Sequence, residues 1–362
     1  KVFMKKIVLY IDNMNRGGAQ RVMGNLAEHF LSKQIKVILV NDYPPDEGVL
    51  NYNLSDQIER VYLRDSYTKS PVVNNYYRLK KLRKLIKDEK PDVVLSFLGG
   101  PNIRMLISTM GIKVKKMVSV RNDPNKEYGQ NRIKRAFVRR LFEQASGCVF
   151  QTEDAAKYFT EDVRNKSTII YNPVAEKFFE TSLSDSRQNV ITVGRLNLQK
   201  NHFLLIDAFA RIADDFPEMN LIIYGEGPLR EQLETYISGK KLENRVSMPG
   251  NVSNVEEVLR KAKVFVLSSD YEGMPNALME AMTVGLPCIS TDCPCGGPRM
   301  LIQNEGQGIL IPCKDEDKMV DALKTVLSSD ELQTMLGENA KNRASDFMSE
   351  KVLGQWDEFL FS

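Results

Sequence analysis

The chain of 362 residues has few of the side chains that bind metals or form disulfides. It has only two histidines, His29 and His202, and five cysteines, an odd number for a disulfide framework. Few cysteines, set mostly in apolar segments, are typical of reduced thiols in a cytosol. Cys293 and Cys295 form a pair, but no second Cys pair or His follows at ligand spacing. We therefore expect no metal site.

Long apolar runs are also missing. No stretch of about 18 apolar residues occurs, as a membrane-spanning helix would need. The start, KVFMKK, lacks the long apolar core of a secretory signal, and we expect Met4 to be the native first residue. The sequence therefore predicts a soluble, globular protein of the cytoplasm.

The net charge of +3 conceals two opposite halves. Residues 1–171 are strongly basic, whereas the remainder of the chain is acidic. A basic half favours a polyanion, an anionic membrane surface or a phosphorylated substrate as its partner, without choosing among them. Because no nucleic-acid-binding motif or aromatic-rich basic platform occurs, we expect no nucleic acid partner.

Short apolar runs alternate with helix-period segments along the chain, which is typical of parallel sheets with crossover helices. The runs of the first half are KIVLYI, KVILVN, DVVLSF, KMVSVR, GCVFQT and STIIYN. Those of the second half are NVITVG, NLIIYG, KVFVLSS, LPCIST and GILIP, with RVSMPG a weaker candidate. The segment YNPV and the polar residues 180–189 separate the two series. The sequence thus predicts an α/β protein with two doubly wound domains, residues 1–172 and 173–345.

A glycine turn follows the first expected strand, where Arg16, Gly17 and Gly18 precede a helix. Ligands of doubly wound sheets bind at the carboxyl ends of strands. Two glycines let the backbone approach a ligand closely, and the helix start can receive an anion. A tight turn without a ligand is the alternative interpretation. The spacing is neither G-x-G-x-x-G nor G-x-x-x-x-G-K-[ST], which weakens a dinucleotide or P-loop interpretation.

The first strand of the second half is followed by GRLNLQKNHF, which places Arg195 and Lys200 just before a helix. Two cations beside a helix start suit a diphosphate. Loop cations are more often solvated, so this pattern alone is weak.

Residues 271–282, YEGMPNALMEAM, keep two glutamates in an otherwise apolar segment. We expect Pro275 to be the first helical residue and Gly285 to end the helix. Glu272 then lies in the turn, and Glu280 lies more than one turn into the helix, where a carboxylate needs hydroxyl or N–H donors. A ribose diol would satisfy Glu280. The alternative is that Glu280 caps a neighbouring loop and that Glu272 is solvated.

Together these motifs resemble the retaining nucleotide-sugar glycosyltransferases of family 4. The resemblance rests on Arg195, Lys200, the E-x7-E pair Glu272/Glu280 and the Gly17–Gly18 turn, and it is most specific over residues 268–301. It implies the GT-B architecture, in which two facing Rossmann-like domains are followed by a last helix that crosses back onto the first. The segment KVLGQWDEFLF, within residues 346–362, fits that helix.

The resemblance also implies roles for individual residues. Arg195 and Lys200 would hold the donor diphosphate, Glu280 the ribose hydroxyls and Glu272 the donor sugar. The remaining expected contacts are backbone groups of Gly273, Met274, Pro275, Asn276 and Ala277 with sugar and phosphate, the loop at Asn251 and Val252 with the base, and Gly17 and Gly18 on the phosphate side.

One position departs from the family. Many members carry a histidine where this chain reads SVRNDP, so Arg121 and Asn122 stand in its place. Neither His29 nor His202 is an evident replacement. The acceptor-activating group therefore stays open, and Arg121 joins Arg195, Lys200 and Glu272 as a candidate catalytic residue. Members that build lipid-linked glycans show a similar S-x-R-N pattern, which favours a variant active site.

The activity implied by the resemblance is metal-independent transfer of a hexose or N-acetylhexosamine, with retention, from a nucleotide diphosphate sugar. UDP is the favoured nucleotide. The expected acceptor is a glycan on a polyprenyl diphosphate, in bacterial surface polysaccharide or glycoconjugate synthesis. The basic amphipathic segments 76–90 and 130–142 can rest on an anionic membrane surface or grip a pyrophosphate. Ordinary crossover helices with solvated basic faces are the alternative to this peripheral membrane location.

Three other functions share some of these features. A nicotinamide oxidoreductase would have paired α/β domains, but the glycine fingerprint is missing from the turns considered. A sugar-nucleotide epimerase or a phosphorylase could have the same architecture. A non-enzymatic protein could use the basic half to bind a polyanion.

Overall fold

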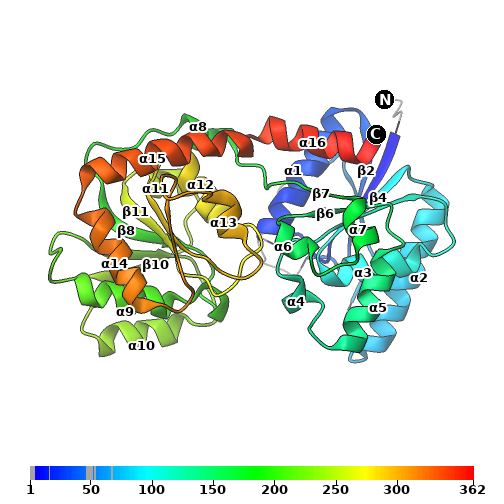
Figure 1. Ribbon diagram of the computed structural model, residues 1–362. Helices are drawn as coiled ribbons and strands as arrows, with labels where there is room; N and C mark the ends of the chain where they lie inside the picture. The colour runs from blue at the N-terminus through cyan, green and yellow to red at the C-terminus, as the bar shows by residue number, and fades with distance from the viewer. Residues whose placement is uncertain (1–4, 16, 46–51, 53, 67) are drawn as a thin grey trace. The chain divides into compact units, whose positions relative to one another are not determined.

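The computed structural model of the protein describes residues 5–15, 17–45, 52, 54–66 and 68–362. Met4 and Arg16 lie outside the described residues. The chain divides into two compact units, shown in Figure 1. Unit 1 comprises Lys1–Asn172 with Leu353–Ser362, and unit 2 comprises Pro173–Val352.

Within the described residues, unit 1 contains a seven-stranded sheet in the order β3-β2-β1-β4-β5-β6-β7, and all of its pairings are parallel. Every residue of the central strand β4 is buried, as expected of a parallel sheet covered on both faces. The strands are β1 (Lys5–Tyr10), β2 (Ile35–Asn41), β3 (Glu59–Tyr62), β4 (Val93–Phe97), β5 (Lys115–Ser119), β6 (Gly147–Phe150) and β7 (Ser167–Ile169).

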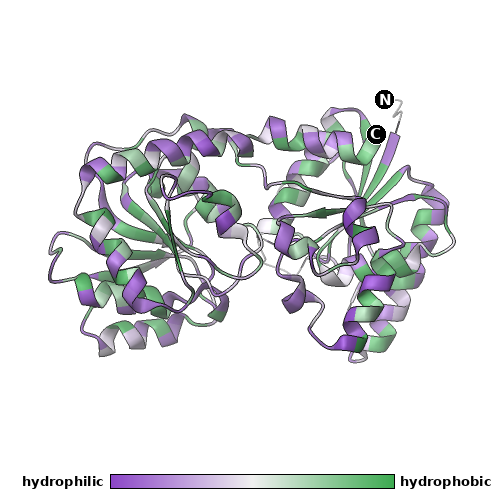
Figure 2. Ribbon diagram, viewed as in Figure 1, coloured by the Kyte–Doolittle hydropathy of each residue, from purple (hydrophilic) through white to green (hydrophobic). Residues whose placement is uncertain are grey.

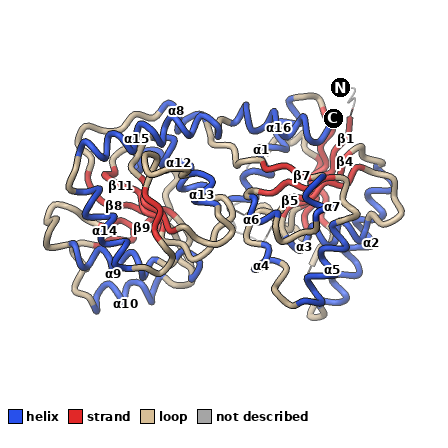
Figure 3. The backbone as a smooth tube through the Cα atoms, in the orientation of Figure 1, coloured by secondary structure: helices blue, strands red, loops and turns tan. Residues whose placement is uncertain are grey.

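The helices of unit 1 connect these strands. They are α1 (Gly18–Ser32), α2 (Pro71–Glu89), α3 (Gly99–Ser108), α4 (Pro124–Glu127), α5 (Arg132–Phe142), α6 (Glu153–Ala156) and α7 (Glu161–Asn165). α3 packs against both α2 and α5, and the tube in Figure 3 shows the three helices gathered beside the sheet. Of the helices that the structure describes, none combines the length and the apolar content needed to cross a bilayer.

Unit 2 contains, among its described residues, a six-stranded parallel sheet in the order β10-β9-β8-β11-β12-β13. Buried apolar side chains of the strands and helices form its core. Figure 2 shows the strands of this sheet largely in the green of hydrophobic residues. The strands are β8 (Gln188–Val193), β9 (Leu221–Tyr224), β10 (Val246–Gly250), β11 (Ala262–Leu267), β12 (Cys288–Thr291) and β13 (Ile309–Ile311).

The helices of unit 2 cover its sheet, with α9 packed against α14 and α12 packed against α15. They are α8 (Glu176–Glu180), α9 (His202–Ile212), α10 (Arg230–Gly239), α11 (Val255–Leu259), α12 (Asn276–Val284), α13 (Gly297–Leu301), α14 (Glu316–Leu327) and α15 (Asp330–Ala344), with short 3-10 helices η1 (Leu198–Lys200) and η2 (Ser345–Phe347).

The last helix, α16 (Ser349–Phe361), begins in unit 2, and from Leu353 onward it belongs to unit 1. Trp356 is fully buried there, and its ring centroid lies 5.7 Å from that of Phe97. Asp357 Oδ2 lies 2.8 Å from His29 Nε2. The predicted helix that crosses back onto the first domain is therefore confirmed.

The predicted α/β fold is confirmed strand by strand, including RVSMPG as β10. One strand was missed: β3, with the sequence ERVY, is half-exposed at the sheet edge and therefore lacks an apolar run. A second expectation was wrong by one residue. Pro275, with ψ of 108°, caps α12 rather than starting it, so the helix begins at Asn276. Gly285 ends the helix in a left-handed conformation, as predicted.

Candidate functional site

A tight turn between β8 and α9 carries Arg195 and Lys200. The Asn197 side chain accepts a hydrogen bond from the Lys200 N–H at 3.2 Å. Asn201 takes a left-handed conformation with φ of 44°, which asparagine tolerates better than most residues. Its side chain then caps α9 by accepting a bond from the Leu204 N–H at 3.4 Å. The two asparagines thus fix the direction in which Lys200 leaves the backbone.

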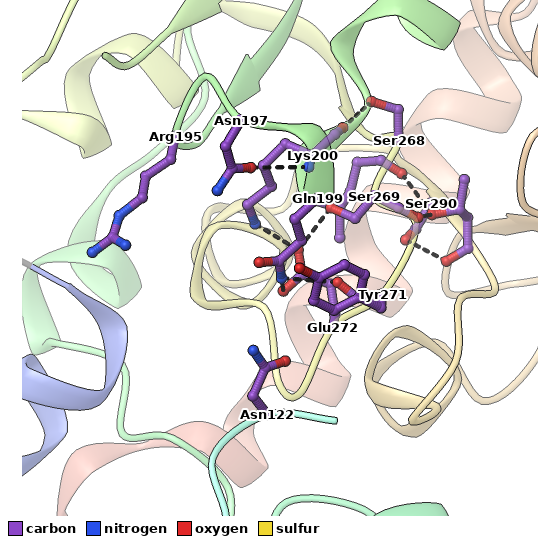
Figure 4. Close-up of polar contacts among 12 residues, drawn as sticks. Asn122, Arg195, Asn197, Gln199, Lys200, Ser268, Ser269, Tyr271, Glu272 and Ser290 are labelled. Carbon is purple, nitrogen blue, oxygen red and sulfur yellow. Dashed lines mark hydrogen bonds and ion pairs between the residues drawn. The ribbon is translucent and has the colours of Figure 1, made fainter. Parts of the chain in front are cut away.

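Lys200 is paired with Glu272 across the end of the sheet. Its Nζ lies 2.6 Å from Glu272 Oε1, and Figure 4 shows the two side chains pointing toward each other. Ser269 Oγ donates a hydrogen bond to the same oxygen at 2.7 Å. The Glu272 side chain is 8% exposed, and a buried carboxylate is costly unless it is paired. This pairing explains how an apolar segment keeps Glu272.

Further hydrogen bonds join the turn after β8 to the turn after β11. Ser268 Oγ donates to the Lys200 carbonyl at 2.9 Å, and Asn201 Nδ2 donates to Asp270 Oδ1 at 2.9 Å. β8 and β11 are neighbours in the sheet, so their carboxyl ends meet at the edge where doubly wound sheets bind ligands. The turn with Lys200 and the turn with Glu272, predicted from separate parts of the sequence, therefore lie side by side and are joined by hydrogen bonds.

The helix α12 places a positive dipole end beside this edge. Its N-cap residue, Pro275, makes no side-chain capping hydrogen bond, and Asn276 and Ala277 form the first turn. Glu280 is 4% exposed on this helix. A Cβ on Gly297 would lie 1.6 Å from the Gly273 carbonyl oxygen, so close backbone packing holds the turn that precedes α12. The glycine pair in CPCGGPRM was the sequence signal for this approach.

Arg195 lies in a pocket of about 130 Å³ together with Asn251 and Val252. The structure thus brings together a residue expected to bind the diphosphate and the loop expected to meet the base. Tyr224, Gly225 and Glu226 also line this pocket, and the site assignment from the sequence missed them. The glycine turn YGEGPLR was their signal.

Three other residues that the sequence predicted to bind the donor do not line that pocket. Lys200, Glu272 and Glu280 are absent from its described lining, and Figure 4 shows the Arg195 side chain extending away from the Lys200–Glu272 pair. The Lys200 ammonium is turned to Glu272, but its stem borders the pocket, since a Cβ on the lining residue Gly194 would lie 3.2 Å from Lys200 Cε. The roles of Arg195 and Lys200 toward a diphosphate stay predictions.

The predicted glycines of unit 1 lie at the start of α1. Gly17 is the N-cap residue in an extended conformation, and Gly18 is the first helical residue. The Gly17 carbonyl accepts hydrogen bonds from the Arg21 N–H at 3.0 Å and from Tyr52 Oη at 3.1 Å. Hydrogen bonds within the protein therefore hold this turn in place. Its role toward a phosphate stays a prediction.

Arg121 follows β5 and is 7% exposed. Its guanidinium donates a hydrogen bond to Asn172 Oδ1 and lies 4.8 Å from the centroid of the Phe97 ring. Burial lowers the pKa of Arg121 and raises the pKa of the neighbouring Glu127 carboxyl. These contacts give Arg121 a structural task, and its part in catalysis stays a prediction.

His202 is the first residue of α9 and is 2% exposed. Its Nε2 lies 3.3 Å from the Arg195 carbonyl oxygen. Burial lowers the pKa of this imidazole from 6.5 to about 4. At neutral pH His202 is therefore an uncharged part of the turn.

Solved structures of other proteins share this fold. Sucrose-phosphate synthase from Thermosynechococcus elongatus matches with a TM-score of 0.83 at 17% identity, covering 98% of each chain. The Anabaena protein HepE, solved with UDP and glucose, matches with a TM-score of 0.82 at 16% identity, covering 99% of this chain and 100% of its own. At this identity the likeness concerns the fold, which is GT-B.

Sequence comparison identifies the family. The model described as glycosyl transferases group 1 matches residues 174–343, and the model described as glycosyltransferase family 4 matches residues 16–178. The chain therefore belongs to the family 4 glycosyltransferases.

A relative from Campylobacter jejuni is 29% identical over 360 residues, covering 98% of this chain and 97% of the relative. It is named GalNAc-alpha-(1->4)-GalNAc-alpha-(1->3)-diNAcBac-PP-undecaprenol alpha-1,4-N-acetyl-D-galactosaminyltransferase.

Proposed function

We propose that this glycosyltransferase moves a hexose or N-acetylhexosamine from a UDP-sugar to a lipid-linked glycan, with retention of the anomeric configuration. The observation that carries the donor part is the Lys200–Glu272 pair at the joined ends of β8 and β11. A lysine held there by one carboxylate can turn its ammonium from that carboxylate to an entering diphosphate, because the ammonium is a point charge on a flexible stem.

The other donor contacts follow from the same edge of unit 2. Arg195 shares its pocket with Asn251 and Val252, which suits a phosphate next to a nucleotide base. Glu280 is the carboxylate proposed for the ribose hydroxyls, and Glu272 would turn to the donor sugar once Lys200 is engaged by phosphate. The similarity in fold to HepE, which was solved with UDP, supports UDP as the nucleotide.

The proposed chemistry needs no metal, because fixed cations and the α12 dipole stabilise the leaving diphosphate. The bond between the anomeric carbon and the phosphate oxygen breaks. The acceptor oxygen forms its bond to the anomeric carbon on the same face, and the departing phosphate oxygen takes the acceptor proton. This route gives retention without a histidine at the position of Arg121.

The acceptor part rests on unit 1. A cleft of about 950 Å³ runs along α2, with apolar residues such as Leu63 and Tyr77 beside basic residues such as Lys80, Lys84 and Lys87. This mixture suits an anionic headgroup attached to a hydrocarbon chain. The printed name of the Campylobacter relative gives an undecaprenyl diphosphate acceptor, which supports the same class here.

Exposed apolar side chains on the two basic helices support a location at the cytoplasmic face of the membrane. Val72 and Tyr76 on α2 are 77% and 58% exposed, and Ile133 and Phe137 on α5 are 83% and 54% exposed. Such side chains next to Lys and Arg can enter the lipid interface while the cations meet anionic headgroups.

The donor and the reaction are tested together. A thermal-shift panel of UDP-, GDP- and ADP-sugars should show stabilisation by UDP-sugars, because a ligand that binds the folded state raises its stability. The sugar that stabilises most is then incubated with a polyprenyl diphosphate-linked sugar, and the anomeric configuration of the product is read by NMR. Product formation without an acceptor would favour an epimerase, and an inverted product would refute retention.

Membrane binding is tested with liposomes that contain anionic phospholipid. The wild type should co-sediment with them at low salt, and the variant Ile133→Ser/Phe137→Ser should bind less. Met335→Ser, which removes an exposed apolar side chain of unit 2, is the matched control and should bind as the wild type does. Binding that does not respond to salt would contradict the role of the basic helices.

A further inference from the structure

Unit 1 has a second, smaller pocket at the carboxyl ends of β1, β2 and β3. Its volume is about 180 Å³, the space of about six water molecules at liquid density. The lining includes Asp12 and Asn13 after β1, Asp42 and Tyr43 after β2, and Tyr62 at the end of β3. It therefore occupies the edge at which doubly wound sheets bind ligands.

One wall of this pocket is a rigid ionic network centred on Asp42. Arg78 Nη1 and Arg104 Nη2 each lie 2.6 Å from Asp42 Oδ2, and Tyr10 Oη donates to Asp42 Oδ1 at 2.6 Å. Arg104 Nε also donates to Tyr10 Oη at 2.6 Å. Arg78 and Arg104 are thus held in place by shared partners, although one carboxylate balances only one of the two positive charges.

Asp12 differs from Asp42 in having capacity for further hydrogen bonds. Its carboxylate accepts hydrogen bonds from backbone N–H groups, that of Asn13 at 2.9 Å among them, whereas a carboxylate has about four acceptor positions. Burial raises the pKa of the Asp12 carboxyl, although the Asn13 hydrogen bond opposes this and the charge of Asp42 adds to it. Asp12 is thus the polar group best placed to receive hydroxyl donors.

The lining favours a neutral, hydroxylated ligand over an anion. Among the lining residues, Asp12 and Asp42 are balanced by Arg60 and Arg78, so the lining presents no net positive charge that would select an anion. Tyr43 and Tyr62 add aromatic surface, which has an apolar body suited to the CH face of a sugar ring. A concave site with a few polar groups and aromatic walls is the usual form of a small-molecule site.

We propose that this pocket binds one neutral sugar ring of the glycan acceptor, with Asp12 accepting hydrogen bonds from its hydroxyls and the rings of Tyr43 and Tyr62 lining its apolar face. This assignment rests on the proposed function, since it names the part of unit 1 that recognises the acceptor glycan. Under this proposal, two sites of unit 1 bind two parts of the acceptor. The pocket around Asp12 binds the sugar, and the basic cleft along α2 binds the lipid diphosphate.

The test uses saturation-transfer NMR on the full chain with methyl α-glycosides of glucose, galactose, N-acetylglucosamine and N-acetylgalactosamine, at saturating UDP. At least one glycoside should bind the wild type and lose its signal in Asp12→Asn, which keeps the shape of the side chain. Asp56→Asn, at an exposed position outside the pocket, is the matched control and should bind as the wild type does. Tyr62→Ala, on the sheet edge, gives a second variant if Asp12→Asn does not fold.

The outcomes separate this proposal from the proposed function. Undiminished glycoside signal in both Asp12→Asn and Tyr62→Ala would overturn the pocket assignment, and so would an absence of signal from every glycoside. Displacement of the glycoside by inorganic pyrophosphate, with a wild-type response to UDP, would show an anion site instead and would also overturn it. If UDP-sugars do not raise the melting temperature of the wild type, that result would instead contradict the proposed function.

Discussion

Both units bury a carboxylate at the carboxyl end of a strand, but they pair it differently. In unit 2, Glu272 is held by Lys200 and by the hydroxyl of Ser269. In unit 1, Asp42 is held by two guanidinium groups and a tyrosine hydroxyl, all at 2.6 Å. Arginine offers a fixed fork of donors, whereas lysine is a single mobile charge. The comparison indicates that the Asp42 network is a structural wall and that the Lys200–Glu272 pair can exchange partners.

The largest effect on stability should come from removing Asp42. Asp42→Ala leaves the half-buried Arg78 and Arg104 without their carboxylate, and breaking a buried pair in this way costs about 3–5 kcal/mol. The free energy of unfolding in urea should fall by that amount. Asp56→Ala on the exposed surface is the control and should stay within about 0.5 kcal/mol of the wild type. A loss of similar size in both variants would contradict the structural role of the network.

The next effect concerns turnover rather than folding. Lys200→Met removes the charge that we propose to meet the leaving diphosphate, so kcat should fall about 100- to 1000-fold, as when one oxyanion donor is lost. Because Glu272 is left unpaired, the variant should also lose stability. Lys200→Met/Glu272→Gln should regain stability without regaining turnover. Wild-type activity of the single variant in a transfer assay would refute the assignment.

A smaller effect concerns His202, whose imidazole lies beside the Arg195 carbonyl in the turn of unit 2. The pKa of His202 falls from 6.5 to about 4 on folding, so the unfolded chain binds the proton more readily between these values. Stability should therefore fall as pH decreases from 6.5 toward 4, by about 3 kcal/mol from this group. His202→Gln should lack this component when urea unfolding is compared at pH 7 and 4.5. An identical pH response in the two proteins would contradict the prediction.

The smallest predicted effect concerns the backbone of the Arg195 pocket. Gly225 has φ of 138°, and a Cβ there would lie 1.9 Å from the Gly194 carbonyl oxygen. Gly225→Ala should therefore lower stability by about 1–3 kcal/mol from strain alone and weaken nucleotide binding. Gly239→Ala, with open space around its Cβ, should be neutral or stabilising by up to about 1 kcal/mol. Calorimetric melting of both variants checks the difference.

Much of the fold followed from the sequence because buried parallel strands are short apolar runs between helices. β3 was missed because an edge strand with the sequence ERVY carries no such run. The glycine turns marked the carboxyl ends of strands in each sheet, since they interrupt the apolar pattern there. Lys200 and Glu272 were singled out because their motifs also follow strand ends, those of β8 and β11.

The contacts among these residues could not be predicted, because they join distant parts of the chain. Lys200 and Glu272 are 72 positions apart, and Asp42 and Arg104 are 62 positions apart. Their pairing depends on strand order: the ends of the neighbouring strands β8 and β11 meet, and Asp42 after β2 reaches Arg104 on α3, the helix that follows β4, across the end of β1. The pocket around Asp12 likewise has no local sequence signal, because three separate strand ends form it.

The central claim is that the Lys200–Glu272 turn holds the diphosphate of the donor. Calorimetric titration of UDP into the wild type and into Lys200→Met tests it directly. UDP should bind the wild type, and its Kd should rise about tenfold or more in the variant, because a charge-assisted hydrogen bond is lost. An equal Kd for the two proteins would contradict it.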